Sequence, residues 1–187
     1  MEFYKHPNIV GKHSILSPSK YHWISYSDDK MIETFRNTLA VQRGTELHEF
    51  AATCIKLGQK LPKANRTLNM YVNDAIGYRM RPEQPLYYSE NAFGTADSIC
   101  FNEKDSFLRI HDLKTGQTPA SEHQLEVYEA LFCLEYDLRP KDIQAELRIY
   151  QSNEKLIIEP DPIDIQNIMD KIKRFDLIIA KMRAEVD

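Results

Sequence analysis

Residues 93–116, which read FGTADSICFNEKDSFLRIHDLKTG, decide the fold. Two runs in this stretch, Phe93–Asn102 and Phe107–Lys114, are rich in residues that favour strands, and the polar residues NEKD mark a turn between them. A connection this short is typical of an antiparallel pair of strands. The pairing would bring Asp97 of the first strand near Asp112 of the second. The stretch therefore predicts two neighbouring carboxylates on adjacent strands.

The segments on either side of this pair predict further helices and strands. The expected elements are a helical region over 28–59 with a fresh start at Gly44-Thr45, a helix over 66–80, a strand over Leu86–Glu90, a helix over 121–136 capped by Ser121, strands over Ala145–Tyr150 and Lys155–Glu159, and a last helix over Ile163–Glu185. This order favours an α/β fold with a central mixed β-sheet flanked by helices. We expect one domain over residues 1–187, in which residues 1–40 form an irregular or helical lead-in.

The bulk composition narrows the class of protein. A chain of 187 residues is long enough for one sizeable core, and its net charge of −4 excludes a polycation that coats nucleic acid. No apolar run is long enough to span a membrane, and the N-terminus does not read as a secretory signal. Cys54, Cys100 and Cys133 are widely separated and odd in number, which favours core thiols in a reducing compartment. We therefore expect a cytoplasmic protein.

Basic residues are concentrated in one part of the chain despite the net negative charge. They are Arg36, Arg43, Lys60, Lys63, Arg66, Arg79 and Arg81. Such a group can steer DNA, although a solvated surface of mixed sign would have the same composition.

Asp112 and Lys114 are alternate residues of a predicted strand, so their side chains project from the same face. The carboxylate can bind a hard divalent cation. The ammonium can orient or deprotonate a water, or stabilise charge that develops on phosphorus. A surface ion pair would show the same pattern. The nearby Asp97 favours a metal site over a simple ion pair, because two neighbouring carboxylates repel unless a cation lies between them.

Two helical features add candidate residues. Gln124 and Tyr128 are four residues apart on the helix that follows Gly116, so they share one face and could contact a phosphate or position Lys114. The alternative is the polar edge of an amphipathic helix. His48 lies beside an apolar stripe of the first helical region, where it is either a core histidine or a metal ligand.

Four short motifs together resemble the RecB-like branch of the PD-(D/E)XK nucleases. They are RGTELH at residues 43–48, GTAD at 94–97, DLKTG at 112–116 and QLEVY at 124–128. Each motif is weak alone, but their order and spacing over residues 43–128 are those of this branch. The resemblance implies a restriction-endonuclease-like core.

The resemblance also implies roles for individual residues. His48, Asp97, Asp112 and the Leu113 carbonyl would bind Mg²⁺ or Mn²⁺, and Lys114 would act on the attacking water. Gln124 and Tyr128 would match the QxxxY element. Ala96 replaces the proline of the family's name, and an upstream glutamate used by some members has no clear counterpart, with Glu46 and Glu49 as the candidates.

These expectations describe a Mg²⁺- or Mn²⁺-dependent deoxyribonuclease whose partner is DNA. The QxxxY branch favours an exonuclease. An endonuclease using the same site, and a catalytically silent nuclease fold that only binds DNA, remain alternatives. The resemblance further allows a homo-oligomer and a recombination or replication partner protein, in the cytoplasm of a bacterial or phage-infected cell.

Overall fold

The computed structural model describes residues 14–116 and 120–185. The chain divides into two compact units, residues 1–43 and 44–187. In the first unit, the 3-10 helix η2 (Pro18–Ser25) precedes the start of α1 (Asp28–Leu57). The indole nitrogen of Trp23 donates to the Ser17 carbonyl at 3.1 Å and closes this short helix on itself. The lead-in is therefore partly helical, while residues 1–13 lie outside the described residues.

The second unit contains a five-stranded mixed sheet, as the sequence predicts. Its strands, in spatial order, are β1 (Arg81–Ser89), β2 (Ala92–Asn102), β3 (Phe107–Leu113), β4 (Gln144–Gln151) and β5 (Glu154–Ile158). Neighbouring strands are antiparallel except β3 and β4, which are parallel. The remaining elements are α2 (Thr67–Gly77), α3 (His123–Glu135), the 3-10 helix η3 (Pro140–Asp142) and α4 (Pro162–Ala184).

Local sequence explains the order of pairing. The connections β1–β2, β2–β3 and β4–β5 are short, so these strands form hairpins. The last hairpin turns at Ser152 and Asn153, whose φ values of 52° and 63° suit a tight turn with the right-handed twist of the strands. Parallel strands need a crossover, and α3 supplies it between β3 and β4.

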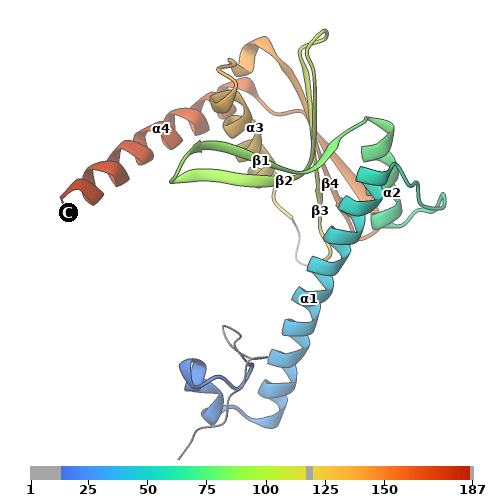
Figure 1. Ribbon diagram of the computed structural model, residues 1–187, viewed down its shortest axis with the longest axis vertical. Coiled ribbons are helices and arrows are strands. Elements are labelled where there is room, and N and C mark those ends of the chain that lie inside the picture. Colours follow the sequence, from blue (N-terminus) through green and yellow to red (C-terminus); the bar gives the residue numbers. More distant parts are fainter. Residues whose placement is uncertain (1–13, 117–119, 186–187) are drawn as a thin grey trace, which may run out of the picture. The chain divides into compact units, whose positions relative to one another are not determined.

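Helices cover both faces of the sheet (Figure 1). One core lies between the sheet and helices α3 and α4, with Leu108, Ile110 and Leu147 fully buried in it. The other core lies beneath α2 and the C-terminal part of α1, and Leu113 and Tyr150 project into it. Successive residues of a strand point to opposite faces, so β3 and β4 contribute to both cores.

Several boundaries differ from the sequence prediction. α1 continues through Gly44-Thr45, so no new helix begins there, since one glycine costs a helix only about 1 kcal/mol. α3 begins at His123 with Glu122 at the N-cap position, although the Ser121 hydroxyl accepts a hydrogen bond from the His123 amide at 3.3 Å. β1 begins at Arg81 and not at Leu86, and it includes Pro82 and Pro85, which an edge strand tolerates.

All three cysteines are free thiols, and Cys54 and Cys133 are buried, as expected of core residues. No helix within residues 14–116 and 120–185 has the length and apolar character needed to cross a membrane.

Candidate active site

Asp97 and Asp112 lie where the pairing of β2 with β3 ends. The last pair of the ladder joins Ser98 to His111, and one step further along the same register sets Asp97 opposite Asp112. Beyond this point a side chain takes the place of a backbone acceptor between the strands. Asp97 Oδ2 accepts a hydrogen bond from the Leu113 amide at 2.8 Å. The predicted proximity of the two strands at these aspartates is confirmed.

Glu83 extends this row of carboxylates onto β1. The residues on either side of Glu83 pair with the residues on either side of Asp97, so the two acids face one another across the strands. Glu83 has a φ of 50°, in the left-handed region that a residue with a Cβ rarely adopts. A row of Glu83, Asp97 and Asp112 therefore crosses β1, β2 and β3.

α1 adds His48 to the row. His48 Nδ1 lies 3.5 Å from Asp97 Oδ2. One ligand atom each from His48, Glu83 and Asp97 lies within 4.8 Å of the others, close enough for one metal ion to contact all three. The contact with Asp97 raises the pKa of His48, while burial and the Asp97 charge raise the pKa of Glu83. These directions are those expected where negative charge accumulates in a partly buried site.

Strand periodicity predicts that Asp112 and Lys114 share one face, and their side chains form an ion pair. Lys114 Nζ lies 3.1 Å from Asp112 Oδ1, and the Asp112 side chain is only 4% exposed. Its second oxygen, Oδ2, is buried and has no hydrogen-bond partner among the described residues. Burial first, and then the Asp97 charge, raise the pKa of Asp112, although Lys114 and His48 oppose them. A buried carboxylate oxygen without a hydrogen-bond partner is unfavourable unless a hydrogen-bond donor or a cation contacts it.

A chain of contacts joins Lys114 to α3. Lys114 Nζ donates to Gln124 Oε1 at 2.7 Å, and Gln124 Nε2 donates to the Tyr128 hydroxyl at 3.4 Å. The Tyr128 ring lies against Gly94, where an added Cβ would stand 2.9 Å from Tyr128 Cε1. The expected shared face of Gln124 and Tyr128 is confirmed, and it is directed at the lysine.

The structure places the other candidates as follows. Leu113 donates its amide to Asp97 and buries its side chain in the core beneath α2, while metal binding by its carbonyl stays a prediction. Glu49 lines a cavity of about 370 Å³ with His48 and Glu83. Glu83, and neither Glu46 nor Glu49, is the glutamate of the three-residue cluster.

Sequence reasoning missed Glu83 because it began the first strand at Leu86. Extending the strand would not have been enough, because uninterrupted pairing from the turn at residues 90–91 sets Glu83 opposite Ser98. The register shift between Tyr87 and Ser89 moves Glu83 opposite Asp97, and no residue pattern signals that shift.

Comparisons with protein-family models, with curated proteins and with solved structures found no match. What the site can do follows from its own chemistry. It combines acidic and imidazole groups suited to a divalent cation with an ammonium held two residues from a buried carboxylate.

Proposed function

We propose that this chain is a divalent-metal-dependent nuclease that hydrolyses phosphodiester bonds in DNA. The observation that carries the proposal is the cluster of His48, Glu83 and Asp97 beside the ion pair of Asp112 and Lys114. Phosphodiester hydrolysis requires charge neutralisation at phosphorus and an activated water, and these two groups of residues suit the two tasks.

The residues fit the implied metal. His48, Glu83 and Asp97 would hold it, with Asp112 at its side through the buried Oδ2 that has no partner among the described residues. Carboxylate oxygens suit Mg²⁺ and Mn²⁺ alike, whereas an imidazole favours a transition-metal ion, so Mn²⁺ should support activity at least as well as Mg²⁺. A divalent ion at such a site neutralises the phosphate and lowers the pKa of a bound water.

Lys114 is the group that acts on the attacking water. Its ammonium is held from two sides, by Asp112 Oδ1 and by Gln124 Oε1. Tyr128 positions Gln124, so α3 sets the direction of the lysine. This arrangement holds a proton-transfer group in place before substrate arrives, which is the condition for efficient general acid–base catalysis.

The finer assignment follows the resemblance to the RecB-like PD-(D/E)XK nucleases. A restriction-endonuclease-like core is supported by the antiparallel meander β1–β2–β3 followed by α3 and the parallel strand β4. The QxxxY element, Gln124 and Tyr128, favours an exonuclease over an endonuclease. Assignment of DNA as substrate rests on this resemblance and not on the fold.

The test is degradation of end-labelled linear DNA beside covalently closed circular DNA, with Mn²⁺, with Mg²⁺ and with EDTA. Lys114→Ala is the catalytic variant, and Lys141→Ala, which removes an exposed lysine of η3, is the matched control. We expect metal-dependent loss of linear DNA by the wild type and by Lys141→Ala. Lys114→Ala should lose at least about 10²-fold in rate, the usual contribution of a general acid or base.

Each outcome decides something. Cutting of the circle would replace the exonuclease with an endonuclease acting at the same site. Activity of Lys114→Ala equal to that of the wild type would overturn the role of this lysine. DNA binding without cleavage under any metal condition would overturn the enzymatic proposal in favour of a nuclease fold that only binds.

A further inference from the structure

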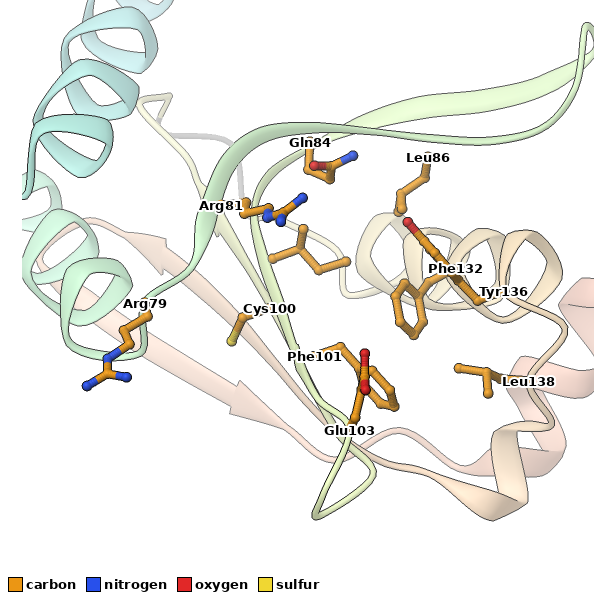
Figure 2. Close-up of a pocket in the computed structure, with 11 residues that line it drawn as sticks. Arg79, Arg81, Gln84, Leu86, Cys100, Phe101, Glu103, Phe132, Tyr136 and Leu138 are labelled. Carbon is orange, nitrogen blue, oxygen red and sulfur yellow. The ribbon is translucent and has the colours of Figure 1, made fainter.

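A second hollow lies beside the candidate active site, between the β1–β2 hairpin and α3 (Figure 2). Its volume is about 550 Å³, within the usual range for small-molecule and cofactor sites. Its floor is apolar, because the buried side chains of Leu86, Ile99 and Phe132 line it. The ring of Tyr136, which is 53% exposed, lies at its rim.

Arg81 gives the hollow a positive charge. Its side chain is exposed, and it has no hydrogen bond or ion pair with any residue that the structure describes. In Figure 2 its guanidinium is directed toward Gln84 and the hollow, whereas that of Arg79 points away from the other lining residues. Glu103 also lines the hollow, near Phe101. An exposed, unpaired guanidinium beside an aromatic wall is suited to a phosphate on a planar ring system.

The hollow is continuous with the candidate active site along the two strands. On β1, Arg81 and Gln84 flank Glu83. On β2, Ile99, which lines the hollow, is the second residue after Asp97. Two strand residues span roughly 6.6 Å, the rise of about two stacked nucleotides.

α3 also joins the candidate active site to the hollow. Phe132 and Tyr136 follow Tyr128 at intervals of four residues, so all three lie on the same side of the helix. Each interval is about 6 Å along the axis. β1, β2 and α3, which carry Glu83, Asp97 and Tyr128 of the candidate active site, therefore also line the hollow.

From this continuity we infer that the hollow binds a nucleotide of the substrate strand, next to the phosphodiester that is cut. The base contacts Phe132 and Tyr136, and the adjoining phosphate pairs with Arg81. Glu103, an acceptor, suits an amino group of the base and would repel a phosphate, which places the phosphate at the Arg81 end. This inference rests on the proposed function, because it takes the occupant from the chemistry proposed for the neighbouring site.

The experiment measures binding without cleavage. A fluorescein-labelled single-stranded octanucleotide is titrated with protein in EDTA, and anisotropy gives the Kd. Arg81→Ala and Tyr136→Ala test the hollow. Arg174→Ala removes an equal charge from an exposed position of α4 that does not line the hollow, and Tyr136→Phe keeps the ring. Both tested side chains are at the surface, and thermal unfolding of each variant verifies that it is folded.

We expect Arg81→Ala and Tyr136→Ala each to weaken binding about tenfold, the usual effect of removing one stacking or phosphate contact. Arg174→Ala and Tyr136→Phe should bind as the wild type does. Equal Kd values for all five proteins, or no binding by the wild type, would overturn the inference. The cleavage assay is read separately, so a working nuclease with an irrelevant hollow is distinguishable from a binding hollow beside an inactive site.

Discussion

Glu83 shows at the level of one residue how a site departs from ordinary backbone preferences. Its φ of 50° costs of order 1 kcal/mol or more for a residue with a side chain. That cost persists where the surrounding structure determines the conformation, which is common at functional sites. Here pairing with β2 on both sides of Glu83 sets the backbone, and the carboxylate then faces Asp97.

Glu83→Gln should lower Mn²⁺ affinity roughly tenfold or more and leave the fold intact, because an amide keeps the shape but removes the charge. Isothermal titration with Mn²⁺ measures the effect. Glu49→Gln is the control, since Glu49 lines the same cavity but lies outside the three-residue cluster. Unchanged Mn²⁺ affinity in Glu83→Gln would remove this residue from the proposed metal site.

Glu129 is a buried acid outside the candidate site. It is 2% exposed, and its Oε2 has no hydrogen-bond partner among the described residues. Burial, with a smaller effect of the Glu126 charge, raises the pKa of Glu129 from 4.5 to about 7. The folded protein therefore holds this proton more tightly than the unfolded chain, so stability falls as pH rises from about 4.5 to 7.

Glu129→Gln should remove this dependence. Relative to the variant, the wild type should lose about 3 kcal/mol of unfolding free energy across that pH window. Urea unfolding of both proteins at pH 5 and pH 8 measures the difference. A gap between the two proteins that does not change with pH would mean that Glu129 is ionised in the folded state throughout.

At the level of elements, α3 approaches β2 closely because of one glycine. A Cβ at Gly94 would stand 2.9 Å from Tyr128 Cε1, tighter than side chains tolerate. The ring that positions Gln124 therefore occupies space that any other residue on β2 would fill. The same approach explains why α3 can direct Gln124 at Lys114.

Gly94→Ala should displace Tyr128, destabilise the fold by about 1–3 kcal/mol through overpacking, and reduce cleavage. Gly77→Ala is the matched control, because nothing lies within 4 Å of a Cβ at the end of α2. That control should be neutral or up to about 1 kcal/mol more stable, since alanine favours helix. Thermal unfolding and the DNA assay are run on both variants. Equal stability and equal cleavage by Gly94→Ala and Gly77→Ala would disprove the close contact between residue 94 and Tyr128.

At the level of the whole second unit, Asp74 joins α2 to the sheet. Its Oδ2 lies 3.2 Å from Arg148 Nη1 and accepts hydrogen bonds from the Tyr150 hydroxyl at 2.7 Å and Lys155 Nζ at 2.9 Å. Burial acts to raise the pKa of Asp74, but these hydrogen bonds and positive charges outweigh it, so the pKa is lowered. One carboxylate thus joins α2 to both strands of the β4–β5 hairpin, which is distant from it in sequence.

Asp74→Asn should cost about 2 kcal/mol at pH 7, because Lys155 loses its anion and Arg148 keeps only Glu146. Since the folded pKa of Asp74 lies below its unfolded value of 3.8, the contribution is present above that value and is lost as pH falls below it. Asp170→Asn, an exposed change on α4, should cost little. Urea unfolding at pH 7 and pH 3 tests this; a pH-independent cost would contradict it.

The sequence by itself determined the features that depend on neighbouring residues. Strand alternation set Asp112 and Lys114 on one face, helix periodicity aligned Gln124 with Tyr128, and a short turn made β2 and β3 antiparallel. Each follows from the two fixed periods of regular structure. Helix ends were less well predicted, because glycine and proline weaken a local pattern without always ending the element.

Only the tertiary structure decided which distant groups meet. Glu83 joined the site because β1 extends past its prolines into register with β2, and His48 joined it because α1 brings its C-terminal part to Asp97. The Arg81 hollow likewise needs β1, β2 and α3 together. These contacts depend on the packing free energy of whole elements, which a local pattern of residues does not determine.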